Sequence, residues 1–367
     1  MQDSPSKLQN HFTGAKIFLN LKQEFIRKHR NKRVKPARSD EMIVKIRTVP
    51  LSIEKLQALI CRTPPVHPKI PIMNVNLSKR LSGYKGETYL DYPLSFLSEK
   101  DYYILHDLRL HDSTHYFQLD SFVISTNFIM ILEVKNIAGE IYFDPIFHQL
   151  IRTLDGKETV FEDPIVQISR QELQLKKWLR KNQFLEIPIL SLVVFTHPKA
   201  LLRTSPENLD LHQKVIHRNF LSTRFTQIEK EYPEERISLK DIKRMIKLLR
   251  KQHTPLDQPI LEQYDIHYDE LLKGVFCPVC HHLPMERTYG TWYCPQCKNK
   301  VKGAHIAALK DYFLLCGPEI TNKNIRDFLR ISSPYLASRL LHSMNLPSDG
   351  TTKNRIYYLS NEREFEK

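Results

Sequence analysis

The chain has 367 residues, 41% of them hydrophobic, which is enough for two or three domains with sizeable cores. Lysine and arginine outnumber aspartate and glutamate by 55 to 41, and the net charge of +14 suits a polyanionic partner such as nucleic acid, although many basic proteins bind none. No apolar run approaches the roughly 20 residues of a membrane span, and the polar N-terminus lacks a signal-peptide core, so we expect a cytoplasmic protein without a membrane partner.

Residues 1–80 are predicted to form a basic N-terminal extension. Eight lysines and arginines from Lys22 to Arg38 stand against a single acidic residue, Glu24. Such a run is either a solvated arm or an extension that contacts phosphates, and both interpretations stay open. Apolar residues at helical spacing predict a helix within residues 41–62, which the following prolines end.

Residues 81–205 have the pattern of an α/β domain with a mixed sheet. The spacing of apolar residues predicts a helix, a set of antiparallel strands, a second helix and then a strand buried on both faces. These elements are expected at residues 86–97, 102–105, 107–110, 116–125, 128–135, 139–143, 164–181 and 187–195.

Two polar residues, Glu133 and Lys135, close an apolar strand and point to the same face because strand side chains alternate. A two-residue turn would pair Ser125 with Phe128, and in that register Asp120 lies directly opposite Glu133. Opposed residues have Cβ atoms about 4.5–5.5 Å apart, which is too close for two carboxylates to ionise cheaply without a cation. The hairpin therefore predicts a metal site.

The chemistry of these side chains suits phosphodiester hydrolysis. Asp120 and Glu133 offer hard oxygen ligands of the kind that Mg²⁺ or Mn²⁺ prefers. Lys135 could orient or deprotonate an attacking water and stabilise a charged transition state. Glu87 is a candidate third carboxylate from the first helix. The alternative is an exposed ion pair at the end of the strand, with Asp120 as an ordinary edge residue.

Residues 82–200 resemble the nuclease-related (NERD) domain, a family of the restriction-endonuclease-like PD-(D/E)xK superfamily. The resemblance rests on five motifs in the family's order, which are Gly86-Glu87, Gln118-Leu119-Asp120, Glu133-Val134-Lys135-Asn136, Gly139 and Asp163-Pro164-Ile165-Val166-Gln167. It implies that Asp120 and Glu133 hold a divalent ion and that Lys135 assists the water. It also implies that Glu87 completes the acidic set and that Gln167 supports the site from the second helix.

Two positions depart from the family pattern. The family often has histidine after the aspartate, where this chain has Ser121, and often asparagine before the proline, where this chain has Asp163. Neither departure removes a presumed metal ligand. Both concern residues that tune the ligands rather than bind the ion.

Residues 206–272 are predicted to be a helical connecting region. Its clearest helix covers residues 238–249, and Pro255 and Pro259 mark a linker.

Residues 273–303 are predicted to form a zinc ribbon. Two CxxC pairs separated by thirteen residues suit a tetrahedral, structural Zn²⁺ site with four thiolates, at Cys277, Cys280, Cys294 and Cys297. A redox pair is the alternative, but it lacks a thioredoxin-like βαβ context. His281 and His282 could replace a thiolate and are more typical of surface residues here.

A hairpin with several aromatic residues is expected between the two CxxC pairs. Trp292 lies near Arg287, and such a combination can stack nucleic-acid bases. In so small a ribbon, the same aromatics are equally typical of a miniature hydrophobic core. Both roles stay open.

Residues 304–367 resemble a winged helix-turn-helix. Helices are expected at residues 304–315, 321–331 and 335–344, followed by a strand at 355–359 that could form a wing. The recognition helix would then present Ser338, Arg339 and His342 to a DNA major groove. A small helical bundle that serves protein contacts is the alternative.

These observations favour a divalent-metal-dependent nuclease whose C-terminal modules hold nucleic acid, with DNA as the expected partner. One alternative is a catalytically silent nucleic-acid-binding or regulatory protein that keeps the nuclease fold. Another makes the C-terminal half a protein-interaction module. The sequence does not define the oligomeric state, the DNA or RNA preference or the mode of cutting.

Overall fold

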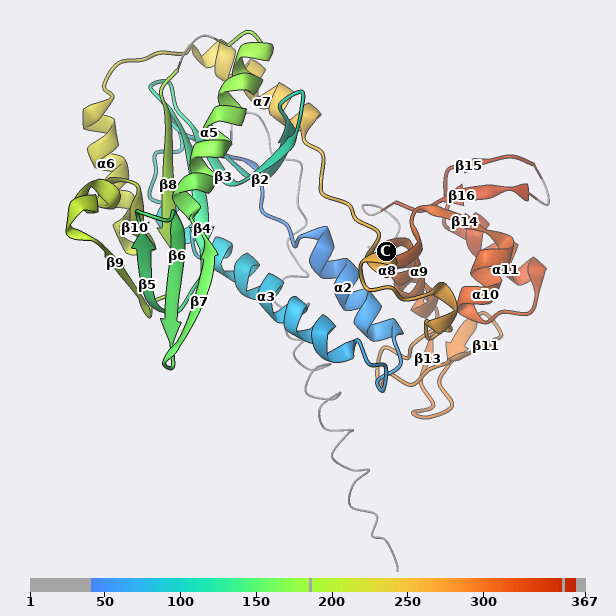
Figure 1. Cartoon of the computed structure of the whole chain (residues 1–367). Coiled ribbons are helices and arrows are strands. Elements are labelled where there is room, and N and C mark those ends of the chain that lie inside the picture. The colour runs from blue at the N-terminus through green and yellow to red at the C-terminus, as the bar shows by residue number, and fades with distance from the viewer. Residues whose placement is uncertain (1–40, 185–186, 352–353, 361–367) are drawn as a thin grey trace, which may run out of the picture.

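The structure is a computed structural model that describes residues 41–184, 187–351 and 354–360. The basic run from Lys22 to Arg38 lies outside the described residues. Figure 1 shows an α/β region and a C-terminal region, with helices α2 (Leu51–Arg62) and α3 (Ile70–Thr88) between them. The predicted α/β fold class with a mixed sheet is confirmed.

The main sheet has six strands in the order β1-β2-β3-β4-β8-β10. Strands β2, β3 and β4 are antiparallel, whereas β1 is parallel to β2, and β8 and β10 continue parallel to β4. The strands are β1 (Ile43–Lys45), β2 (Tyr103–His111), β3 (Tyr116–Ile124), β4 (Ile129–Lys135), β8 (Ile189–Phe195) and β10 (Val215–His217). The boundary at residue 205 stays a prediction, but the sheet itself continues beyond it.

The predicted register of the β3–β4 hairpin is confirmed. Ile124 pairs with Ile129 and Ser121 pairs with Leu132, as the two-residue turn requires. The Ser125 amide donates to the Phe128 carbonyl oxygen over 3.0 Å. At the other end, the ladder stops at the pair Ser121 and Leu132, so Asp120 and Glu133 follow directly after the last paired residues.

Helices cover both faces of the main sheet. Helices α5 (Pro164–Lys181) and α7 (Leu239–Gln252) pack on one face, where Trp178 and Met245 are fully buried. Helices α4 (Asp91–Leu94) and α6 (Leu221–Glu231) pack on the other face around Phe225. Helix α5 begins at the predicted residue, and its amphipathic spacing explains why.

A second sheet has four strands in the order β7-β6-β5-β9, of which the sequence predicted only one. The strands are β5 (Gly139–Asp144), β6 (Gln149–Leu154), β7 (Lys157–Glu162) and β9 (Ala200–Thr204), and short 3₁₀ helices follow at η2 (Pro206–Gln213) and η3 (Arg218–Phe220). Gly139 has a φ of +107°, and an added Cβ would lie 2.5 Å from the Thr153 carbonyl oxygen. The sharp entry into β5 therefore requires glycine.

The helix expected over residues 86–97 is wrong in its limits. The helix that carries Glu87 is α3, which begins sixteen residues earlier, at Ile70, and ends at Thr88. Pro71 lies in its first turn, where a missing N–H costs no helical hydrogen bond. Pro71 therefore lies in the start of this helix, whereas α2 ends at Arg62, before Pro64, as the sequence predicts.

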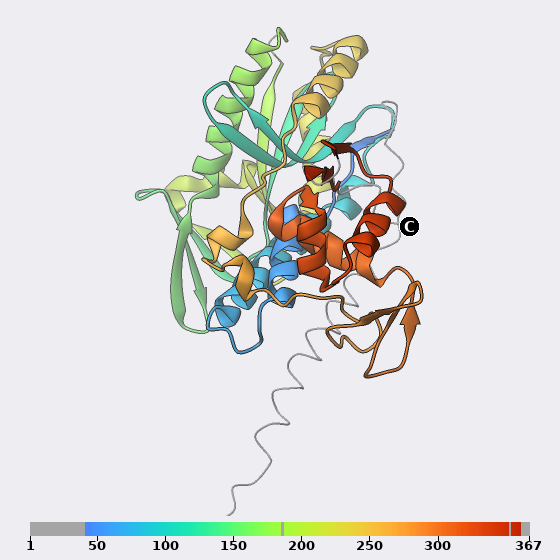
Figure 2. The same cartoon turned by 90° about the vertical axis from the view of Figure 1, so that its right-hand side faces the viewer.

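The C-terminal region shares one hydrophobic core between the cysteine-bearing hairpin and the helices that follow, around Trp292, Leu309 and Phe328. Its elements are α8 (Ile260–Gln263), η4 (Tyr268–Glu270), β11 (Glu286–Thr288), β12 (Thr291–Tyr293), β13 (Lys300–Val301), α9 (Ala304–Cys316), β14 (Glu319–Thr321), α10 (Asn322–Leu329), α11 (Pro334–Ser343), β15 (Ser348–Asp349) and β16 (Ile356–Tyr358). Figure 2 shows this region from the side. Within the described residues, no helix has the length and apolar character needed to cross a membrane.

Candidate active site and cysteine cluster

Three carboxylates come together at the open end of the β3–β4 hairpin. Glu133 on β4 is 4% exposed, and Asp120 on β3 accepts a hydrogen bond from the Val134 amide over 2.9 Å. Glu87 approaches from the last turn of α3 and interacts electrostatically with both. The structure thus brings together the three acidic residues that the sequence singled out.

Burial makes the ionised forms of Asp120 and Glu87 costly. Burial, reinforced by the charges of Glu133 and Glu87, raises the pKa of Asp120 well above its ordinary value. Burial likewise raises the pKa of Glu87 to about 7, although the nearby Arg47 guanidinium opposes this shift. A divalent cation would relieve the same cost, so hard oxygen donors in this setting fit Mg²⁺ or Mn²⁺.

The acidic site is not a ready cage of three donors. Among the described residues, four cysteines form the one group of three or more metal-ligating side chains whose ligand atoms lie within 4.8 Å of one another. An ion at the acidic site would therefore be held by Asp120 and Glu133, and water would complete its shell, as is usual for Mg²⁺.

Lys135 is held beside Glu133 by two short hydrogen bonds. Its Nζ donates to Glu133 Oε1 over 2.7 Å and to Gln167 Oε1 over 2.8 Å. The Gln167 amide in turn donates to Glu133 Oε1 over 2.8 Å. The alternative of an exposed ion pair is wrong, because the Glu133 side chain is 6% exposed and the Lys135 side chain 21%.

Gln171 is a site residue that the sequence interpretation missed. It follows Gln167 by one helical turn on α5 and is 6% exposed. Its Nε2 donates to Glu133 Oε2 over 3.0 Å and to the Gln118 carbonyl oxygen over 3.0 Å. The spacing i, i+4 from Gln167 was the signal that could have found it.

Arg47 is a second missed residue, located between β1 and α2. Its guanidinium donates to Glu87 Oε2 over 2.7 Å and to the Asp120 carbonyl oxygen over 3.4 Å. The same group reaches Ser121 Oγ at 3.0 Å and His106 Nδ1 at 2.9 Å. No spacing in the sequence connects Arg47 to the acidic residues, so only the tertiary structure reveals it.

Both departures from the family pattern have a local role. Ser121, in place of the usual histidine, accepts from Arg47 and lies 2.9 Å from His106 Nδ1. Asp163, in place of the usual asparagine, caps α5 by accepting from the Ile165 amide over 2.8 Å. Asparagine and aspartate are both good N-caps, so this exchange preserves the start of the helix.

Gly86 allows α3 to lie against the ends of β4 and β8. An added Cβ would lie 2.4 Å from Asn136 Cβ and 3.0 Å from Thr196 Oγ1. A side chain at this position would therefore push α3 away from the sheet. Because Glu87 follows directly, this close approach helps to set the position of its carboxylate.

The four cysteines form a compact cluster that could bind zinc, as predicted. Their Sγ atoms lie within 4.8 Å of one another, and none is in a disulfide. The Asn299 amide donates to Cys297 Sγ over 3.3 Å and helps to lower the pKa of that thiol to about 6. His281 and His282 are not part of the cluster, which agrees with a shell of four thiolates.

Trp292 is not available for base stacking, so that part of the nucleic-acid prediction is wrong. Its side chain is 1% exposed, and its Nε1 donates to His305 Nδ1 over 3.1 Å. Arg287 packs over the Trp292 ring, with 5.2 Å between guanidinium and centroid. The tryptophan is buried with Met285 in the core that the ribbon shares with the helices that follow.

Helix α11 presents two of the three predicted contact residues to solvent. Arg339 and His342 are exposed. Ser338 is half-buried, and its Oγ accepts from the Asn322 amide over 2.8 Å. Arg355, beside β16, lies 3.5 Å from His342 Nε2 and so extends the same basic surface.

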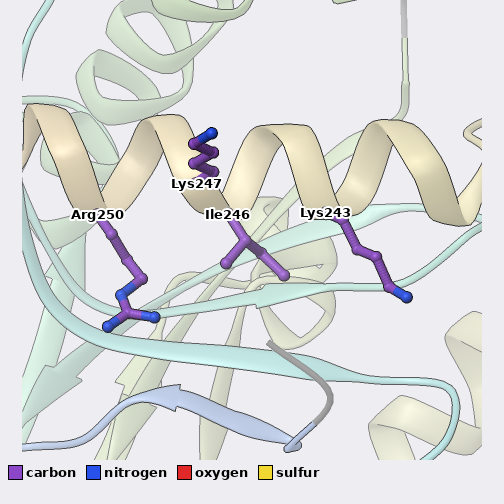
Figure 3. A pocket seen from close by; sticks show the side chains of 4 residues that line it. All are labelled: Lys243, Ile246, Lys247 and Arg250. Carbon is purple, nitrogen blue, oxygen red and sulfur yellow. The ribbon is translucent and has the colours of Figure 1, made fainter. Parts of the chain in front are cut away.

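A further basic surface lies on α7, which the sequence identified as a helix but not as a site. Figure 3 shows Lys243, Ile246 and Arg250 pointing to one side of the helix. Together with Lys247 they line a cavity of about 380 Å³. The cationic lining favours an anionic occupant.

One known protein family matches the part of the chain that carries the three acidic residues and Lys135. Residues 82–196 match the family model described as the nuclease-related domain. The chain is also similar to an uncharacterized protein of Bacillus anthracis, with 29% identity over 139 residues that cover 37% of this chain and 60% of that protein. The chain thus spans less than two thirds of the length of this relative. No solved structure matches the chain. Over residues 82–196, this chain is therefore similar to the nuclease-related (NERD) domain.

Proposed function

We propose that the protein is a divalent-metal-dependent nuclease that hydrolyses phosphodiester bonds in DNA. The observation that carries this proposal is the contact of Lys135 with both Glu133 and Gln167, beside Asp120. This contact holds an ammonium group and a pair of carboxylates at one point of the nuclease-related domain. An ammonium group beside metal-binding carboxylates suits the attack of water on a phosphate group.

The side chains divide the work between holding the ion and guiding the water. Asp120 and Glu133 would bind Mg²⁺ or Mn²⁺, which would supply Lewis-acid activation of the phosphate. Glu133 keeps this capacity because a carboxylate has about four lone-pair sites, and three donors occupy it here. Lys135 orients the attacking water and stabilises the negative charge that develops on the phosphate.

Gln167 and Gln171 act on the ligands rather than on the substrate. They fix the two oxygens of Glu133 from consecutive turns of α5. Such partners keep a carboxylate oriented for metal binding.

The C-terminal region and α7 would hold the polyanion. Arg339, His342 and Arg355 form one candidate contact surface, and the basic side of α7 forms another. A structural Zn²⁺ in the cysteine cluster would maintain the shared core beneath Arg287 and α11. In this proposal, residues 304–367 form a winged-helix-like domain that contacts DNA.

A catalytically silent nucleic-acid-binding protein is the second candidate. It is favoured because, among the described residues, no three carboxylates at the acidic site have ligand oxygens within 4.8 Å of one another. In that case, DNA binding would persist without any cleavage. The option of a protein-interaction module would instead predict no salt-sensitive DNA binding.

Cleavage assays separate these candidates. Purified protein is incubated with plasmid and single-stranded DNA in Mg²⁺ or Mn²⁺, beside Lys135→Ala and the control Lys176→Ala, an exposed lysine on α5. We expect cleavage by the wild type and the control but not by Lys135→Ala. Cleavage that survives Lys135→Ala would contradict the role assigned to Lys135, and DNA binding without cleavage by the wild type would contradict the nuclease proposal.

A further inference from the structure

A buried arginine from outside the nuclease-related domain reaches into the acidic site. Arg47 precedes the matched residues 82–196 by 35 positions, and its side chain is 4% exposed. A guanidinium cannot shed its charge on burial, so the surroundings must compensate for it. The nearest carboxylate is that of Glu87, at 2.7 Å.

The contacts of Arg47 hold two parts of the site at once. One terminal nitrogen, Nη1, donates to Glu87 Oε2 on α3 and to the Asp120 carbonyl oxygen on β3. A single planar group thus connects the helix that carries one acid to the strand that carries another.

The other terminal nitrogen fixes the plane of the guanidinium. Nη2 lies 2.9 Å from His106 Nδ1 and 3.0 Å from Ser121 Oγ. Because arginine only donates, His106 Nδ1 must accept and carries no proton. Burial and the nearby cations of Arg47 and Lys45 lower the pKa of His106, which agrees with a neutral ring. These two contacts fix the orientation of the guanidinium, while Nη1 donates to Glu87.

We propose that Arg47 is a positioning residue of the acidic site, which holds the Glu87 carboxylate against β3. The inference rests on the metal site proposed above. It makes the segment between β1 and α2 a functional part of a nuclease site whose family match begins at residue 82. The basic N-terminal extension predicted for residues 1–80 thus contains a site residue.

Lysine cannot reproduce this arrangement. An ammonium is a point donor on a flexible stem, whereas the planar fork of Arg47 serves Glu87 and Ser121 in opposite directions. The conservative substitution Arg47→Lys therefore keeps the charge but loses the geometry. Comparing Lys with Met at this position separates the two contributions.

The test is Mn²⁺ binding to the full-length protein by calorimetry, which does not depend on turnover. We expect Arg47→Met to weaken Mn²⁺ binding on the order of 10- to 100-fold, the range typical of residues that support a metal site from outside its ligands, because the Glu87 carboxylate would no longer be held near Asp120 and Glu133. Arg47→Lys should recover part of this loss. Arg62→Met is the matched control, because Arg62 is equally buried but pairs with Asp311 in the C-terminal half. The control should bind Mn²⁺ as the wild type does.

A double-mutant cycle with Glu87→Gln shows whether Arg47 acts through Glu87. If it does, adding Arg47→Met to Glu87→Gln should change Mn²⁺ affinity by no more than roughly twofold. A further tenfold loss in that background, or equal loss in the Arg62→Met control, would overturn the positioning role while leaving the nuclease proposal intact. Absence of Mn²⁺ binding by the wild type would instead overturn the metal site, and this inference with it.

Discussion

The cysteine cluster and the acidic site differ in how the chain assembles them. All four thiols lie within 21 consecutive residues, from Cys277 to Cys297, and two short turns bring them together. The acidic site instead combines a loop, a helix, two strands and a second helix, from Arg47 to Gln171. A local site is specified by spacing, whereas a dispersed site depends on the packing of the whole domain.

Zinc removal should have the largest effect, and it should stay confined to one region. Structural zinc contributes roughly 10–16 kcal/mol of binding free energy in small zinc fingers. We expect about one zinc per chain by elemental analysis, and loss of the near-ultraviolet dichroism of the ribbon in Cys280→Ser. The control Cys316→Ser, outside the cluster, should keep its zinc. Mn²⁺ binding at the acidic site should survive in both variants, and its loss would show that the two sites are not independent.

Replacing Gln171 should lower the cleavage rate and Mn²⁺ affinity of the acidic site without unfolding the protein. Gln171→Leu takes a donor from Glu133 Oε2, so cleavage and Mn²⁺ affinity should fall by roughly 10- to 100-fold. Gln174→Leu, on the same helix but without a contact to Glu133, is the matched control. Unchanged kinetics in Gln171→Leu would show that Glu133 is held by Lys135 and Gln167 alone.

Two glycines of α3 test how finely the helix must be placed. Gly86→Ala puts a Cβ 2.4 Å from Asn136, so we expect about 1–3 kcal/mol of destabilisation in urea unfolding, with weaker Mn²⁺ binding. Gly83 has nothing within 4 Å of an added Cβ, so Gly83→Ala should stabilise the helix by roughly 0.5–1 kcal/mol. Equal effects of the two substitutions would show that the approach of α3 to the sheet is not critical.

The pH dependence of metal binding should be the smallest of these effects. Because the pKa of Glu87 is raised to about 7, its protonation below that pH removes a negative charge near the metal site, and this group alone should lower Mn²⁺ affinity by at most about tenfold per pH unit. The stability of the metal-free protein depends on pH in the opposite direction. Because the fold favours protonated Glu87, the free energy of unfolding decreases as the pH rises from the ordinary carboxyl pKa to about 7. Titrations on both sides of pH 7 check the sign, and Glu87→Gln should flatten the profile.

Much of the acidic site was predictable because it depends on local rules. The period of two along β4 placed Glu133 and Lys135 on one face, and the two-residue turn set the register that brings in Asp120. The resemblance to the nuclease-related domain added Glu87 and Gln167. Arg47 could not be predicted, because its partners are distant in sequence and it lies before the family motifs.

In the fold, too, the elements with a clear local sequence pattern were predicted, and those that depend on distant contacts were missed. Strongly amphipathic helices such as α5 were predicted to the residue, whereas the short strands β6, β7, β9 and β10 were missed. These strands are stabilised by pairing with neighbours rather than by their own sequence pattern. Trp292 was misassigned for a related reason: the sequence shows an aromatic residue beside an arginine but not which side of the hairpin faces the core.

Helix α3 also has a mechanical consequence. Its first turns pack through Met73 and Leu77 against the core shared with α2 and α9, and its last turn carries Glu87. Its 19 residues make it a rigid rod of about 28 Å. A tilt of only about 2° at one end would displace the other end by about 1 Å, which is a large error for a carboxylate that supports a metal site. The position of Glu87 therefore depends on how the opposite end of α3 packs against α2 and the last residues of α9, in a core separate from the one that contains the cysteine cluster.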